Sequence, residues 1–146
     1  NNLMPVQEHM MVNIIRQKII AAIDGIERPL QPDKKKIILF LPSNEYHEIG
    51  LLLAHYILVH KGYSCIYLGQ NVPFDNVAVL VEKYKKVKFL TFIHERNIDE
   101  SFHEFVDLHH ADLWIACDKK VVPLIKHYKS LTYIHSTQDL EKLIRI

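Results

Sequence analysis

An uninterrupted apolar run marks the segment from Lys36 to Pro42, and a second long apolar stretch follows it closely. A strand that shows no alternation of polar and apolar positions is buried on both faces, which is typical of a parallel sheet covered by helices. Downstream the pattern alternates between strands and helices. It predicts strands over 36–42, 64–68, 88–93, 111–117 and 131–135, and helices over 47–61, 75–86, 99–108, 119–128 and 137–145, with Asp75, Asp99 and Thr137 as helix N-caps.

Five strands joined by helical crossovers predict an α/β fold, a flavodoxin-like (Rossmann-type) parallel sheet of strand order 2-1-3-4-5. In such sheets, ligands bind outside the carboxyl ends of the strands, where the strand order reverses. The reversal falls between the first and third strands. Because His47 follows the first strand and Thr91 lies near the end of the third, we expect both to line one crevice.

The residues ahead of the sheet region have the pattern of a single helix. Pro5 can open it, and the pattern from Val6 to Ile23 continues to Gly25, a suitable C-terminal cap. Its apolar face is too wide for a lone surface helix and requires partners. Two prolines within 27–35 predict a linker, so the main domain spans 36–146.

Composition limits the class of protein. The chain has 146 residues, of which 49% are hydrophobic and 24% charged, as expected of a globular domain rather than a disordered one. Its net charge of +1 gives no argument for nucleic acid or a membrane surface as the direct partner. No apolar run approaches the roughly 20 residues of a membrane helix, and no signal peptide is visible. We therefore expect a cytoplasmic protein in which Cys65 and Cys117 are free thiols.

The strongest candidate for chemistry is His47, which has Glu45 two residues before it and Gly50 three residues after it. Imidazole is the commonest metal ligand among side chains, and a carboxylate on its second nitrogen fixes the tautomer and raises its basicity. Gly50 would let a bulky planar ligand approach the helix backbone. The alternative is that His47 is a polar residue at a helix start and Glu45 a solvated acid.

The segment Glu45-Tyr46-His47-Glu48-Ile49-Gly50 resembles the D-x-H-x-x-G signature of cobalamin-binding domains, with glutamate in the aspartate position. The stretch 67–73 resembles the second strand of that family and its L-G-x-x-V-P turn, which includes Gly69 and Val72. Thr91-Phe92-Ile93 stands where the family has S-x-L. The resemblance covers roughly 35–146. It implies that His47 coordinates the cobalt of cobalamin, paired with Glu45, and that the Thr91 hydroxyl contacts the nucleotide tail of the cofactor.

One departure from the family pattern concerns the end of the fourth strand. The family has Gly-Gly there, where the nucleotide tail passes, and this chain has Ala116-Cys117. Added side chains could narrow that slot. The tail is then held differently, cobalamin affinity is reduced, or the domain has lost the cofactor.

The pair Glu8-His9 resembles the end of the W-x9-E-H motif of one branch of cobalamin sensors, whose tryptophan would precede Asn1. By that resemblance the pair contacts the upper adenosyl group. The alternative is a polar first turn, in which the helix dipole favours a glutamate. Because the chain begins with Asn1 and not Met, we expect a fragment of a longer protein.

Together these features resemble the light-responsive, adenosylcobalamin-dependent branch of MerR-type transcriptional regulators. The resemblance implies that 1–26 is the C-terminal part of a helical cap bundle and that DNA is bound through a domain outside this chain. It also implies a homo-oligomer, light as the signal, no membrane partner, and a regulator rather than an enzyme. Two alternatives remain open: a corrinoid carrier domain of a methyltransferase or mutase, and a degenerate domain that serves only in dimerisation.

Overall fold

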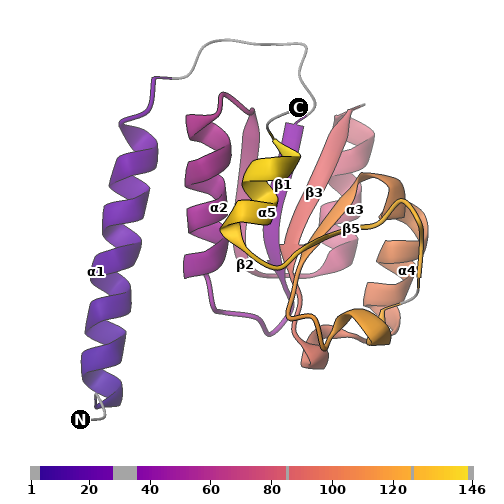
Figure 1. The fold of residues 1–146 in the computed structure, drawn as a ribbon, viewed down its shortest axis with the longest axis horizontal. Coiled ribbons are helices and arrows are strands. Elements are labelled where there is room, and N and C mark those ends of the chain that lie inside the picture. Colours follow the sequence, from indigo (N-terminus) through magenta and orange to yellow (C-terminus); the bar gives the residue numbers. More distant parts are fainter. Residues whose placement is uncertain (1–3, 28–35, 85, 126, 145–146) are drawn as a thin grey trace.

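The computed structural model describes residues 4–27, 36–84, 86–125 and 127–144. Among them, five strands form one sheet in the order β2-β1-β3-β4-β5, and every neighbouring pair is parallel (Figure 1). This is the predicted topology. The strands are β1 (Lys36–Pro42), β2 (Cys65–Val72), β3 (Val87–Phe92), β4 (Leu113–Ala116) and β5 (Thr132–Ile134).

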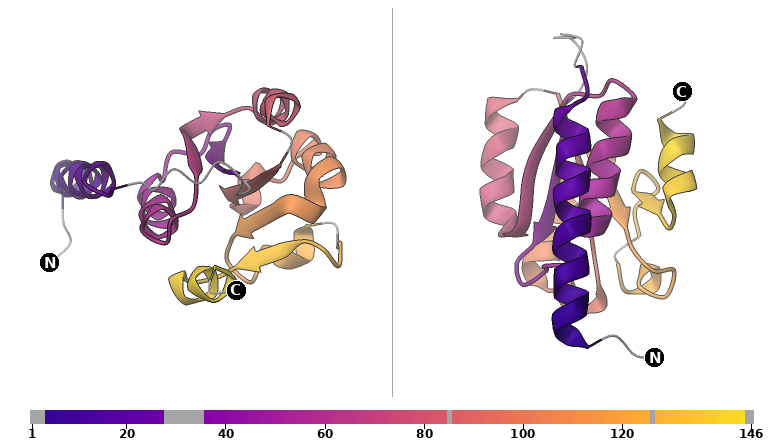
Figure 2. Two further views of the ribbon diagram at one scale, coloured as in Figure 1. Left: turned by 90° about the horizontal axis from the view of Figure 1, so that it is seen from above. Right: turned by 90° about the vertical axis from the view of Figure 1, so that its left-hand side faces the viewer.

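Helices cover both faces of the sheet. The side facing α2 and α5 takes Ile37, Leu39 and Leu41 from β1, whereas Ile38 and Phe40 pack on the side of α3 and α4. Because β1 is buried on both faces, its sequence has no polar alternation. The two layers are visible end-on in Figure 2. The helices are α2 (Ile49–His60), α3 (Phe74–Lys83), α4 (Glu100–His109) and α5 (Thr137–Leu143).

The segment 119–128 departs from the prediction of a helix. Its described residues form turns and the short 3-10 helix η3 (Val122–Leu124). Pro123 explains the difference, because proline has no N–H to donate to the preceding turn and disfavours helical backbone at the residue before it. The two other 3-10 helices of the described residues are η1 (Glu95–Asn97) and η2 (His110–Asp112).

Helix capping agrees with the sequence in one case of three. The Asp99 carboxylate accepts a 2.9 Å hydrogen bond from Phe102 N, so Asp99 is the N-cap of α4 as predicted. The N-cap of α5 is Ser136, one residue before the predicted Thr137. Helix α3 begins directly after Pro73, which places Asp75 inside the first turn rather than at the cap.

Helix α1 (Pro5–Asp24) stands beside α2 and outside the sheet layers, with its first turns at the level of the carboxyl ends of the strands (Figures 1 and 2). Gly25 follows it as the C-cap, as predicted. Of the predicted linker, residues 28–35 lie outside the described part of the chain. The wide apolar face is present and largely uncovered. The exposed large apolar residues of the helix are Val6, Met10, Met11, Val12, Ile14, Ile15 and Ile20.

No helix in the described ranges combines the length and the apolar character needed to cross a bilayer.

Candidate functional site

The loop between β1 and α2 is anchored by the end of β2. Asn44 and Asn71 both have positive φ, 63° and 58°, a conformation that asparagine adopts more readily than most residues. The Asn71 side-chain oxygen accepts from Asn44 N at 3.0 Å, and Asn71 N donates to the Glu45 carbonyl at 3.2 Å. These contacts set the backbone position from which Glu45 and His47 project.

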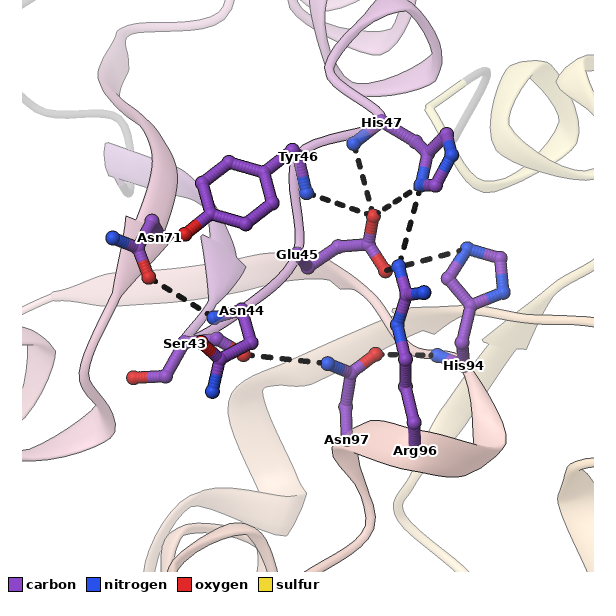
Figure 3. Close-up of polar contacts among 9 residues, drawn as sticks. All are labelled: Ser43, Asn44, Glu45, Tyr46, His47, Asn71, His94, Arg96 and Asn97. Atoms are coloured by element: carbon purple, nitrogen blue, oxygen red, sulfur yellow. Dashed lines mark hydrogen bonds and ion pairs between the residues drawn. The ribbon is translucent and has the colours of Figure 1, made fainter.

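Glu45 is fully buried, yet its carboxylate is surrounded by donors (Figure 3). Its Oε1 accepts from the backbone N–H groups of Tyr46 and His47, both at 2.9 Å, and lies 2.6 Å from Nδ1 of His47. Its Oε2 accepts from Nη2 of Arg96 at 2.8 Å and lies 3.6 Å from Nε2 of His94. This degree of pairing is what a buried carboxylate requires.

The same contacts set the ionisation of Glu45. Burial raises its pKa, but the His47 backbone N–H, the Arg96 guanidinium, the His47 ring and the charge of His94 outweigh burial and lower the pKa to about 2. An ionised carboxylate only accepts hydrogen bonds, so Nδ1 of His47 carries the proton that it donates to Glu45. The 3.4 Å contact between Arg96 Nη2 and the same Nδ1 therefore joins two donors.

Because Nδ1 of His47 is paired with Glu45, Nε2 is the ring nitrogen that remains available to a ligand. Its side chain is 76% exposed at the carboxyl edge of the sheet, so the ring lies outside the protein interior. With the proton on Nδ1, the lone pair of Nε2 is free to coordinate a metal. The structure thus brings Glu45 and His47 together as the hydrogen-bonded pair that the sequence predicts.

A cleft of about 630 Å³ runs between α1 and this loop. One wall comes from α1 and includes Glu8 and His9, and the other includes His47 and Gly50. The residues predicted to contact the cofactor from above and from below therefore line one cleft. The remaining residues that line it are Val12, Asn13, Arg16, Tyr46, Glu48, Ile49 and Gln70.

A second, mainly apolar cavity of about 290 Å³ lies between α2 and α5. Gly50 borders it as well as the cleft, so the two are neighbours. Ala116 and Cys117 border this cavity without filling it, and Cys117 also packs against the core under α3 and α4. Burial, and to a lesser extent the charge of Asp118, raises the pKa of Cys117 to about 11, so its thiol is neutral. The departure from Gly-Gly at β4 therefore leaves space at this position.

The position of Gly50 is also restricted by a neighbouring side chain. A Cβ at this position would lie 2.8 Å from Cε1 of Phe92, closer than carbon atoms approach each other. A larger residue at this position would therefore require the ring of Phe92, which also lines the cavity, to move.

Three predicted cofactor contacts do not line the cleft or the cavity. Thr91 is fully buried, and its strand neighbours Phe40 and Ile115 belong to the core under α3 and α4, on the opposite face from the cavity. Gly69 is buried near Glu48 and Tyr67 with a φ of 82°, and Val72 packs against the same core as Thr91. The Thr91 hydroxyl finds no hydrogen-bond partner among the described residues.

Arg96 and His94 both contact the Glu45 carboxylate, but the sequence analysis did not predict a role for either residue. They follow β3, which is the neighbour of β1 in the sheet. The strand order alone places the loop after β3 beside the loop after β1, so basic residues soon after the third strand were the available signal. One ligand atom each from Glu45, His47 and His94 lie within 4.8 Å of one another.

Neither protein-family models nor curated proteins match this sequence. Among solved structures, 33 chains match its fold. A cobalamin-binding protein from Desulfitobacterium hafniense superimposes with a TM-score of 0.63 at 17% identity, over 77% of this chain and 59% of its own. The monomethylamine corrinoid protein of Methanosarcina barkeri superimposes with a TM-score of 0.61 at 15% identity, over 92% of this chain and 62% of its own. A chain of the methanol:cobalamin methyltransferase complex of the same organism superimposes with a TM-score of 0.57 at 16% identity, over 97% of this chain and 56% of its own.

The two Methanosarcina matches cover more of this chain than residues 36–146 alone could account for. They therefore include residues that precede the sheet. This chain spans less than two thirds of the length of each of the three structures. At these identities the likeness concerns the fold: the chain has the fold found in these cobalamin-binding and corrinoid proteins.

Proposed function

We propose that this chain binds a corrinoid and that His47 supplies Nε2 to the cobalt. The Glu45–His47 pair carries the proposal. The carboxylate lies 2.6 Å from Nδ1 and is held ionised, so in the neutral ring the proton is on Nδ1 and the lone pair of Nε2 faces outward at the mouth of a parallel sheet. A histidine ligand whose second nitrogen is bonded to a carboxylate is the arrangement that metal-binding proteins commonly use.

The space around the pair also fits a corrinoid. The cleft beside His47 offers room for a large planar group, and the neighbouring apolar cavity offers room for a nucleotide tail. Because Ala116 and Cys117 leave the cavity open, we favour binding with the tail in this cavity over a domain that has lost the cofactor.

When bound, the corrinoid supplies a cobalt centre able to form and break a bond to carbon. The protein supplies the surroundings. His47 would hold the metal, Glu45 keeps the His47 tautomer, and Arg96 keeps Glu45 in place through its 2.8 Å hydrogen bond. Glu8 and His9 would shield the opposite side of the cleft.

Two biological roles fit a module of this kind. The first is the sensor of a light-responsive, MerR-type regulator that binds adenosylcobalamin and acts on DNA through a separate domain. Such a sensor works as an oligomer and catalyses no reaction. The position of Glu8 and His9 in the cleft wall supports this role. The second is a corrinoid carrier, supported by the likeness to a corrinoid protein over 92% of the chain. Adding adenosylcobalamin in the dark and measuring oligomeric state before and after illumination separates them, because only the sensor requires a change.

The test of corrinoid binding uses hydroxocobalamin and the visible spectrum of the purified protein. We expect uptake with nitrogen coordination from the protein, and we expect His47→Ala to lose that coordination and to bind at least about 100-fold more weakly. His127→Ala, at an exposed position away from the cleft, is the matched control. A His47→Ala spectrum equal to that of the wild type would refute the proposal.

A further inference from the structure

Helix α1 touches the rest of the molecule along a narrow stripe. Within Pro5–Asp24, Ile23 is the one buried residue, and Arg16 and Ile19 are half-buried. Every residue of the helix before Arg16 is exposed. The half of α1 that forms the cleft wall, with Glu8 and His9, therefore has no buried attachment of its own to the described residues.

Arg16 is the first residue along α1 to be held by the body of the protein. Its Nε lies 2.6 Å from Oε2 of Glu48, which is only 8% exposed. The other carboxylate oxygen, Oε1, accepts a 2.8 Å hydrogen bond from the Tyr67 hydroxyl. The ring of Tyr67 stacks on His55 at 5.0 Å and 13°. A chain of polar contacts thus joins α1, the start of α2 and β2.

The charges of this cluster are interdependent. Glu48 lies too deep to be well hydrated and relies on Arg16 and Tyr67 for compensation. Burial, followed by the hydrogen bond to Glu48, raises the pKa of Tyr67 above its ordinary value, so the phenol remains a donor. Removing Arg16 would leave a buried carboxylate with a single side-chain donor among the described residues, and would release α1 there.

The cluster also lies next to the proposed metal ligand. Glu48 directly follows His47 in the chain, and its carbonyl accepts from Leu52 N at 2.9 Å to open α2. Both Arg16 and Glu48 line the cleft. Glu8 lies eight residues from Arg16, about 12 Å along the helix, and about 22 Å from Ile23. Without the Arg16 contact, the cleft wall would depend on the half-buried Ile19 and the buried Ile23, which lie further along the helix.

We propose that Arg16 is a positioning residue: with Glu48 and Tyr67 it clamps α1 to the start of α2, so that Glu8 and His9 stay across the cleft from His47. The inference rests on the proposed corrinoid function for its purpose, and on the contacts above for its geometry. It makes the ion pair between Arg16 and Glu48 the connection through which movement of α1 and occupation of the cleft affect each other.

The first experiment measures hydrogen exchange of the protein without cofactor. An isolated helix of this length is marginally stable in water, so release of α1 exposes its amides. We expect Arg16→Met to speed exchange over 8–16 roughly tenfold, the effect of losing one hydrogen bond to a charged group, with no change in β1 or β3. Glu48→Gln should act in the same direction. Lys18→Met, which removes a charge from an exposed position of the same helix, should have no effect.

The second experiment measures release of hydroxocobalamin into an excess of a competing binder. Arg16→Met should release it about tenfold faster while the visible spectrum of the bound form stays unchanged, and Arg16→Lys should restore part of the loss. Unchanged exchange in Arg16→Met, or faster exchange with unchanged release, would overturn the clamp. A wild-type protein that takes up no cobalamin would refute the proposed function instead, and the exchange experiment would then decide the clamp alone.

Discussion

The cleft beside His47 and the apolar cavity beside Phe92 meet at Gly50, but they are built by different means. At the cleft, a few polar atoms hold one another at hydrogen-bond distance around the buried Glu45. At the cavity, side chains from α2, α5 and three strands simply leave a space unfilled. The cleft therefore depends on the charge of Glu45 and the orientation of its hydrogen bonds, whereas the cavity depends on how the surrounding side chains pack.

This difference determines what each region tolerates. Replacing an ionised group by a neutral one of the same shape should damage the cleft, because buried donors lose the charge they bond to. The same kind of isosteric change should hardly affect the cavity. Adding volume should have the reverse pattern: it should affect the cavity most, since a side chain that fills the space leaves no room for a ligand.

The largest expected effect is that of Glu45→Gln. The pKa of Glu45 lies near 2 against an ordinary 4.5, so its ionised form stabilises the fold by roughly 3 kcal/mol at neutral pH. Glutamine keeps the shape but loses this contribution, and cobalamin affinity should fall 10- to 100-fold as the partner of His47 loses its charge. Urea unfolding and a cobalamin titration measure the two losses. Glu95→Gln, at an exposed position of η1, is the control.

Acid titration checks the same prediction by another route. Because folding depresses the pKa of Glu45, its contribution is complete above about pH 4.5 and is lost as the pH falls towards 2. Asp99, whose pKa is lowered by the Phe102 N–H and the Ser101 hydroxyl, adds to the loss in the same direction. The Glu45→Gln variant should therefore show a shallower decline. Equal slopes for variant and wild type would mean that Glu45 does not provide this stability.

A smaller effect is expected from Ala116→Leu, which adds volume where the cavity is open. Ala116 belongs to the core under α2 and α5 and lines the cavity, so the larger side chain would occupy this space and cobalamin affinity should fall about tenfold or more. Cys117→Ala, which removes a thiol that packs against the core under α3 and α4, should bind as well as the wild type. If Ala116→Leu bound cobalamin normally, the nucleotide tail would have to lie elsewhere.

The same contrast explains what the sequence could reveal. The strands, the sheet order and the Glu45–His47 pair follow from local patterns: apolar runs, and an acid two residues from a histidine at a strand exit. The cavity follows from packing between distant segments, and no motif encodes it. Ala116 and Cys117 therefore looked like an obstruction in the sequence, although they border open space in the structure.

Long-range contacts account for the remaining differences. Arg96 lies 51 residues from Glu45 in the chain, and Arg16 lies 32 residues from Glu48, so neither pair leaves a local signature. By contrast, Pro123 is a local feature that disfavours the predicted helix over 119–128, and the structure has only the short 3-10 helix η3 there.

The smallest expected effect is that of Thr91→Val, and it separates fold from cofactor binding. The Thr91 hydroxyl is buried without a hydrogen-bond partner among the described residues, and valine replaces it with a methyl group of similar size. Removing an unpaired buried hydroxyl should leave the free energy of unfolding unchanged or raise it by up to about 1 kcal/mol. Because the side chain lies on the α3 and α4 face, away from the cavity, cobalamin affinity should not change. A clear loss of affinity with unchanged stability would show instead that the hydroxyl reaches the cofactor, and would move the nucleotide tail from the apolar cavity to the opposite face of β3.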